Sequence, residues 1–182
     1  MQRLINLSLE DVRGENTAAQ SKGVFSLARF IHEARDAAQL DADTRGSALI
    51  VADVDELLGI QGDRDLLLAA LANLLNNALK FTCAHTAVSL TAYAEGQRIL
   101  IVVRDHCGGL PAGNAEKMFS PFTQRGDDRS GLGLGLSIAR QSIQRSGGQL
   151  SVEDFPGVGC AFTMSLPRHL ALDGFPPADK AH

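Results

Sequence analysis

The feature that most constrains the fold is a long helical pattern of apolar residues followed directly by two strand patterns. From Asp63 to about Phe81 the apolar residues recur every three or four positions, which is typical of a helix with one broad buried face. Residues 87–94 and 98–104 then follow the strand pattern around the turn EGQ, and the second is almost continuously apolar. Because each element must bury an apolar face against another layer, this succession predicts helices packed on a sheet.

The remaining segments supply further elements of both kinds. Further helices are expected at 1–13, from a cap at Ser26 through Ala38, and from the glycine stretch to about Ser146, and further strands at 48–52, 149–154 and 159–166. Residues 105–130 are expected to form a long loop with at most one short helical piece. The predicted fold class is α+β, a two-layer α/β sandwich in which helices cover one face of a mixed sheet, with an N-terminal helical extension.

Composition and charge exclude several classes of protein. The 182 residues carry a formal net charge of -4 and no basic run, which argues against a general nucleic-acid binder. The longest apolar runs are strand-sized and the first residues lack a signal-peptide core, so we expect a cytoplasmic domain without direct membrane contact, with membrane anchoring left open for the parent protein. The three cysteines, Cys83, Cys107 and Cys160, are widely spaced and odd in number, which favours free thiols in a reducing compartment.

Three glycines stand at alternate positions in GLGLGLSIA (131–139), directly before a predicted helix. Ordered glycine costs conformational entropy, so either this backbone approaches a ligand phosphate or the stretch is only a flexible entry into the helix. It is not a P-loop, because no Gly-Lys-Ser/Thr follows, and not a dinucleotide fingerprint, because Ile138 stands where the third glycine would be. The glycines alone leave the two interpretations open.

Asn73, Asn77 and Lys80 interrupt the apolar pattern of the long helix. At about 100° per residue they fall within about 60° of one another and form a polar stripe at the rim of the buried face. Such a stripe is either a solvated face or, because it combines two amide oxygens with an ammonium group, a site for magnesium and phosphate.

A second polar feature follows the apolar strand, where Asp105 precedes Gly108 and Gly109. Asp followed by glycines is ordinary turn chemistry, but a carboxylate at a strand end is also suited to recognising an exocyclic amino group. Further on, Phe119 and Phe122 stand in a polar loop, where they either anchor a lid or plug the core.

Four segments, taken in order, carry a resemblance to a known family. NLLNNALKFT (73–82), DHCGGLP (105–111), FSPF (119–122) and GLGLGLSIA (131–139) resemble the N, G1, F and G2 boxes of the histidine-kinase catalytic domain. That domain belongs to the ATP-binding superfamily of DNA gyrase, Hsp90 and MutL, and the resemblance covers roughly residues 48–167. It implies the Bergerat ATP-binding fold, ATP and Mg2+ as cofactors, and glycines that line the triphosphate site under a mobile lid.

The resemblance also implies a role for each matching residue. Asn77 would be the magnesium ligand, and Lys80 would meet phosphate as a compact charge. Asp105 would accept the adenine amino hydrogen, and Gly109 would let the base lie against the backbone. The set expected at the phosphates comprises Gly131, Leu132, Gly133, Leu134 and Gly135, with Arg125 and Arg129 as further candidates.

Asn73 distinguishes this chain from the hydrolytic relatives. Gyrase and Hsp90 carry a glutamate at the equivalent place, which activates water, whereas an asparagine cannot act as that base. The site is therefore expected to hold ATP intact for transfer, with Asn73 and Lys80 as the catalytic residues. Two departures from the family pattern, Cys107 for a common glycine and Cys160 for Ser or Thr, are expected to affect affinity more than activity.

The resemblance implies a sensor histidine kinase that transfers the γ-phosphoryl group of ATP to a histidine on its own dimerisation and histidine phosphotransfer domain, for relay to a response regulator. His32 begins an acceptor-like His-Glu motif, but no proline follows and Asn73 is too close for a complete helical hairpin, so the acceptor is expected outside this chain. The expected organisation is a remnant of the second dimerisation helix and linker (1–22), a monomeric catalytic domain (23–167) and a flexible tail (168–182). A serine kinase of the anti-sigma type and a nucleotide-binding module without transfer are the alternatives.

Overall fold

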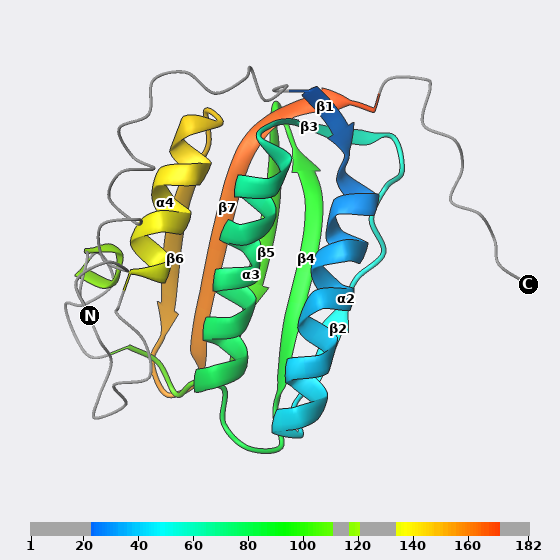
Figure 1. Cartoon of the computed structure of the whole chain (residues 1–182). Helices are drawn as coiled ribbons and strands as arrows, with labels where there is room; N and C mark the ends of the chain where they lie inside the picture. Colours follow the sequence, from blue (N-terminus) through cyan, green and yellow to red (C-terminus); the bar gives the residue numbers. More distant parts are fainter. Residues whose placement is uncertain (1–22, 111–116, 121–133, 172–182) are drawn as a thin grey trace, which may run out of the picture.

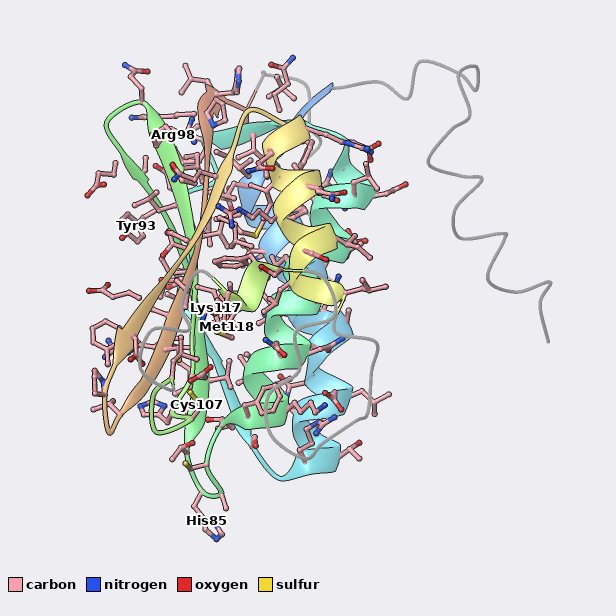
Figure 2. The ribbon with its side chains drawn as sticks, turned by 90° about the vertical axis from the view of Figure 1, so that its left-hand side faces the viewer. His85, Tyr93, Arg98, Cys107, Lys117 and Met118 are labelled. Atoms are coloured by element: carbon pink, nitrogen blue, oxygen red, sulfur yellow. The ribbon has the colours of Figure 1, made fainter. Side chains whose placement is uncertain are left out.

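The computed structural model describes residues 23–110, 117–120 and 134–171. Its helices are α2 (Leu27–Arg45), α3 (Arg64–Phe81) and α4 (Gly135–Arg145), with a 3-10 turn η1 (Lys117–Phe119). Its strands are β1 (Gly23–Ser26), β2 (Ala48–Val51), β3 (Leu58–Gly62), β4 (Ala87–Glu95), β5 (Arg98–Arg104), β6 (Gln149–Phe155) and β7 (Gly159–Leu170). The helices lie side by side on one face of the sheet (Figure 1), and a view turned by 90° shows the two layers in profile (Figure 2). The predicted α+β sandwich is confirmed.

The sheet is built around β7, its longest strand. The strand order is β1-β3-β7-β5-β4-β2, with β6 also paired to β7. β7 pairs antiparallel with β5 over 161–167, with β6 over 159–165 and with β3 over 168–170. β2 pairs with β4 in parallel, so the sheet is mixed, as predicted. Among the described helices, none is both long enough and apolar enough to span a membrane.

The core lies between the sheet and the helices. Every second residue of β5 is fully buried and stands opposite a buried residue of β7: Ile99 opposite Leu166, Ile101 opposite Met164, and Val103 opposite Phe162. The buried face of α3 consists of Leu67, Ala70, Leu71, Leu74, Leu75, Ala78 and Leu79. Since each fully buried large apolar side chain contributes roughly 1.5–3 kcal/mol, this interface is the main stabilising contact of the domain.

Two helices begin directly after side-chain caps, and the sequence predicts the first of these, Ser26. Ser26 caps α2 by accepting a hydrogen bond from the Arg29 N–H at 3.4 Å, and Asp63 caps α3 by accepting one from the Leu66 N–H at 3.1 Å. α2 ends at Gly46, whose φ of 65° lies in the left-handed region that favours glycine.

The sequence pattern does not predict β1 and β3. β3 has the sequence LGIQG, and two glycines in five residues obscure a strand pattern. The glycine at 62 has a packing reason, because a Cβ there would lie 2.8 Å from the Leu67 Cδ1 atom of α3. β7 also continues to Leu170 to pair with β3, so residues 168–170 belong to the sheet and not to the tail expected from 168. The helix expected at 1–13 lies outside the described residues.

Candidate functional site

Asp105 lies at the end of the buried row of β5. It follows Ile99, Ile101 and Val103 by the same two-residue step, which directs its side chain toward the face that the helices cover. Its N–H donates to the Cys160 carbonyl of β7 at 2.9 Å, and only 3% of the residue is exposed. The packing of the core strands therefore positions a buried carboxylate at the edge of the core.

Two peptide N–H groups hold this carboxylate. The Oδ1 atom of Asp105 accepts hydrogen bonds from the Cys107 N–H and the Cys160 N–H, both at 3.0 Å. Within the described part of the chain, no hydrogen bond reaches the other oxygen, Oδ2. Hydrogen bonds to an ionised acceptor are stronger than neutral ones, so Oδ1 is well anchored and Oδ2 is the oxygen that can accept a hydrogen from a ligand.

The loop that follows β5 is held against the turn between β6 and β7. Gly108 and Gly109 have φ values of 82° and 96°, a region that favours glycine. A Cβ on Gly109 would lie 3.1 Å from Asp154 Oδ1, and this oxygen already accepts the Leu110 N–H at 2.7 Å. Gly109 is therefore required by backbone conformation and packing, and contact with a base would be a role added to these.

The C-terminal end of α3 lies beside the same loop. The Cys83 N–H donates to the His106 carbonyl at 3.0 Å, and the His106 N–H donates to Thr82 Oγ1 at 3.2 Å. The Nδ1 atom of His106 lies 2.8 Å from the Ala87 carbonyl oxygen. These contacts join the C-terminal end of α3 and the Asp105 loop at one end of the molecule (Figure 1).

Asn73, in the middle of α3, lies beside the first residue of α4. A Cβ placed on Gly135 would be 3.6 Å from both Cγ and Oδ1 of Asn73. α4 follows Leu134 without a side-chain cap and without an acidic residue in its first turn. Its first N–H groups and the positive end of its dipole therefore lie next to the Asn73 amide, an arrangement suited to an anion.

Asn77 and Lys80 lie further along α3 than Asn73, and all three are half-buried, whereas Asn76 is exposed. This difference in exposure agrees with the rim position predicted from helical spacing. The Lys80 ammonium lies 5.2 Å from the centroid of the Phe81 ring, within the range of a cation–π contact. One side of α3 thus carries two amides and one ammonium group.

Phe119 of η1 is a core residue. It is 5% exposed, and the Arg140 guanidinium carbon of α4 lies 5.0 Å from its ring centroid. Of the two interpretations of the FSPF phenylalanines, core packing is confirmed for Phe119. The other predicted residues of the loop and glycine stretch lie outside the described residues: Phe122, Arg125, Arg129, Gly131, Leu132 and Gly133.

The structure also brings together two cysteines that the sequence analysis treated as separate thiols. The Sγ atoms of Cys107 and Cys160 lie 3.3 Å apart, and one ligand atom from each of these cysteines and from Asp105 lies within 4.8 Å of the others. Asp154, which holds the Leu110 N–H, was not predicted either. The signal that could have found the thiol pair is the register of β5 against β7, which places Cys160 beside Asp105.

Comparison with known proteins identifies the family. The model of the histidine kinase-, DNA gyrase B- and HSP90-like ATPases matches residues 62–170, which include α3, the Asp105 loop and α4. The chain belongs to this family.

Two curated relatives are sensor kinases. Over 113 residues the chain is 39% identical to the alginate biosynthesis sensor protein KinB of Pseudomonas aeruginosa. The aligned part is 62% of this chain and 19% of KinB. Over 168 residues it is 32% identical to the sensor histidine kinase ZraS of Escherichia coli O157:H7. The aligned part is 92% of this chain and 35% of ZraS. The chain thus spans well under half the length of either relative.

Solved structures agree with this assignment. The catalytic domain of the histidine kinase ThkA superposes with a TM-score of 0.71 at 25% identity, covering 80% of this chain and 94% of that domain. Full-length ShkA in complex with AMPPNP superposes with a TM-score of 0.77 at 27% identity, covering 93% of this chain and 36% of ShkA. The chain contains an ATP-binding catalytic domain of the sensor histidine kinase type.

Proposed function

We propose that this domain transfers the γ-phosphoryl group of ATP to a histidine on the dimerisation domain of its kinase, and that the phosphoryl group then passes to the receiver domain of a response regulator. The observation that carries the proposal is the buried Asp105 carboxylate, with Oδ1 held by two peptide N–H groups and Oδ2 available to a ligand. The proposal also includes a cytoplasmic location, where ATP is available, and a monomeric state for the isolated domain.

The adenine end of the site is the Asp105 loop. An exocyclic amino group donates hydrogen bonds, and a carboxylate oxygen only accepts them, so Oδ2 of Asp105 can bind the amino group of adenine. A base with a carbonyl oxygen at that position would bind less well, because two acceptors would face each other. Gly109 packs against the β6–β7 turn without a side chain, and this packing holds the loop that carries Asp105 in place for a base.

The phosphate end is the region between α3 and α4. The uncapped start of α4 at Leu134 and Gly135 offers N–H groups to a phosphate, and the Lys80 ammonium offers a compact positive charge. Asn77 also fits Mg2+, because its amide supplies the hard oxygen ligand that this ion prefers. The remaining coordination positions of the ion are then left to waters and phosphate oxygens. Bound Mg2+ would neutralise charge on the phosphates.

Asn73 favours transfer over hydrolysis. It lies beside the start of α4, where a glutamate would be placed to activate water, and an amide cannot take up that proton. Neither His32 nor His106 fits an acceptor: no proline follows the His-Glu motif of His32, and His106 lies next to Asp105, at the proposed adenine end of the site. The acceptor is therefore proposed on another domain.

Mixing the chain with labelled ATP, Mg2+ and a separate dimerisation domain tests the proposal. We expect little label on the chain alone, because no acceptor is positioned in line with the γ-phosphate, and acid-labile, base-stable label on the added domain. Label on the chain that is lost in His32→Gln would refute the external acceptor. Acid-stable, base-labile label on a partner would favour a serine kinase, and ATP binding without any transfer would favour a regulatory module.

A further inference from the structure

Two thiols lie against the carboxylate that the proposed function assigns to adenine. The Sγ atoms of Cys107 and Cys160 are 3.3 Å apart although the residues are 53 positions apart in the chain. A disulfide has an S–S distance of about 2.05 Å, so the two sulfurs need to approach by only a little over 1 Å. The backbone already holds both residues in this arrangement, because their N–H groups share one acceptor, Asp105 Oδ1.

The two thiols differ in accessibility. Cys160 is 1% exposed, whereas Cys107, in the loop after β5, is half-buried and lies toward one end of the sheet (Figure 2). Cys107 is therefore the thiol that a solution oxidant reaches first, and Cys160 is the neighbour that completes the bond. Cys83 is exposed but does not belong to the group of close ligand atoms, which makes it a control within the same chain.

We propose that Cys107 and Cys160 form a redox-active thiol pair, oxidised by a low-molecular-weight disulfide, and that the resulting disulfide weakens nucleotide binding. This inference rests on the proposed role of Asp105. The Cys107 thiolate attacks one sulfur of the oxidant, forming a mixed disulfide and releasing one thiol. Cys160, after losing its proton, attacks Cys107 Sγ and releases the second thiol. Two electrons pass from the cysteines to the oxidant, which becomes two thiols.

Disulfide formation acts on binding through the shared carboxylate. Drawing the sulfurs together pulls on the two residues whose peptide N–H groups hold Asp105 Oδ1, and a shift of either peptide displaces the carboxylate. A base contact depends on the position of Oδ2 within a few tenths of an ångström, because hydrogen bonds weaken steeply outside their preferred geometry.

A metal site is the competing interpretation, and the geometry favours the thiol pair. Two sulfurs bound to one tetrahedral zinc at about 2.3 Å lie about 3.8 Å apart, which is farther than the 3.3 Å observed. The group of close ligand atoms found among the described residues also contains three members, Asp105, Cys107 and Cys160, where a structural zinc takes four.

Nucleotide binding and disulfide formation must affect each other equally, because the two equilibria are thermodynamically linked. If the disulfide lowers nucleotide affinity tenfold, saturating nucleotide must favour the dithiol by the same factor. For a two-electron couple that factor moves the reduction potential by about 30 mV, toward easier reduction.

The experiment uses the Cys83→Ser chain, so that the exposed thiol does not form intermolecular bonds. The protein is equilibrated in reduced and oxidised glutathione at several ratios, peptide mapping by mass spectrometry locates disulfides, and calorimetry measures AMPPNP affinity in each state. We expect a disulfide between Cys107 and Cys160, an affinity at least fivefold weaker in the oxidised form, and recovery with dithiothreitol. Adding Cys107→Ser to the Cys83→Ser background should remove the glutathione dependence of the affinity, whereas adding Cys160→Ser should stop the reaction at the mixed disulfide of Cys107, which the same mass measurement detects.

The outcomes separate this inference from the proposed function. Absence of the disulfide at the most oxidising ratio, or an unchanged affinity once it has formed, would overturn the inference. Zinc that copurifies with the chain and prevents oxidation would overturn it in favour of a metal site. Reduced protein that fails to bind AMPPNP would instead refute the proposed function, because disulfide formation is detected by mass without nucleotide.

Discussion

Replacing Asp105 with asparagine separates the structural role of this side chain from its proposed role in binding adenine. The asparagine carbonyl keeps an acceptor at Oδ1 for the Cys107 and Cys160 N–H groups. The other oxygen becomes an NH2 group, which presents hydrogens to the hydrogens of the adenine amino group. The folded domain therefore keeps most of its contacts, while the proposed adenine contact changes from donor–acceptor to donor–donor.

The expected changes in unfolding free energy and in ATP affinity follow from these contacts. Loss of the charge-assisted part of two hydrogen bonds should lower the free energy of unfolding by about 1 kcal/mol. An adenine donor left without its partner should weaken ATP binding by about 1–3 kcal/mol, which is roughly 5- to 150-fold in affinity. Asp105→Ala should weaken binding similarly but cost about 1–3 kcal/mol more stability, because the buried Cys160 N–H loses its acceptor.

Calorimetry with ATP and with inosine triphosphate measures how the substitution changes the affinity for each nucleotide. Inosine carries a carbonyl oxygen where adenine carries the amino group, so the asparagine NH2 group can donate to it. We expect the wild-type domain to prefer ATP and Asp105→Asn to lose that preference, with thermal unfolding as the check on stability. An unchanged ratio of the two affinities in a folded Asp105→Asn domain would refute the assignment of Asp105 to the base.

Three further substitutions test other parts of the site. Asn77→Ala should remove mainly the magnesium-dependent part of ATP affinity, and an equal loss with and without Mg2+ in calorimetry would show that Asn77 is not the ligand. Gly135→Ala should leave thermal stability intact, since its Cβ would meet Asn73 at an ordinary 3.6 Å, but should weaken ATP binding if phosphates lie between them; unchanged affinity would count against a phosphate site there. Gly159→Ala places a Cβ 2.1 Å from the Asp105 carbonyl oxygen and should cost about 3 kcal/mol in denaturant unfolding, and a near-neutral result would contradict the close packing of β7 on the end of β5.

Much of the fold was predictable from local chemistry. α2 and α3 follow from apolar spacing, and α2 also follows from the predicted cap at Ser26. The observed α3 begins directly after Asp63, within one residue of the expected start. β4 and β5 follow from two strand-length patterns around a short turn, the second of them almost continuously apolar. β1 and β3 were not predictable in this way, because each is short and β3 depends on pairing with residues 168–170, more than a hundred positions away.

The site also contains residues that local sequence predicts and residues that it does not. The side of α3 that carries Asn73, Asn77 and Lys80 was predictable because helical geometry relates residues a turn apart. The thiol pair was not, because its sulfurs meet through the register of β5 on β7, which local sequence does not determine. Cysteines that are widely spaced along the chain therefore gave no indication that they lie in contact.

Asp105 links the stability of this domain to its ligand. The residue occupies a core position at 3% exposure, and within the described chain two peptide N–H groups bind only one of its oxygens. No buried side-chain oxygen among the described residues lacks a partner, so Oδ2 is open to solvent, and a ligand donor there would replace water with a charge-assisted hydrogen bond. Nucleotide at one hundred times its dissociation constant should then raise the stability of the wild-type domain by about 2.7 kcal/mol. The same nucleotide concentration should raise that of Asp105→Asn by much less, since its affinity is weaker.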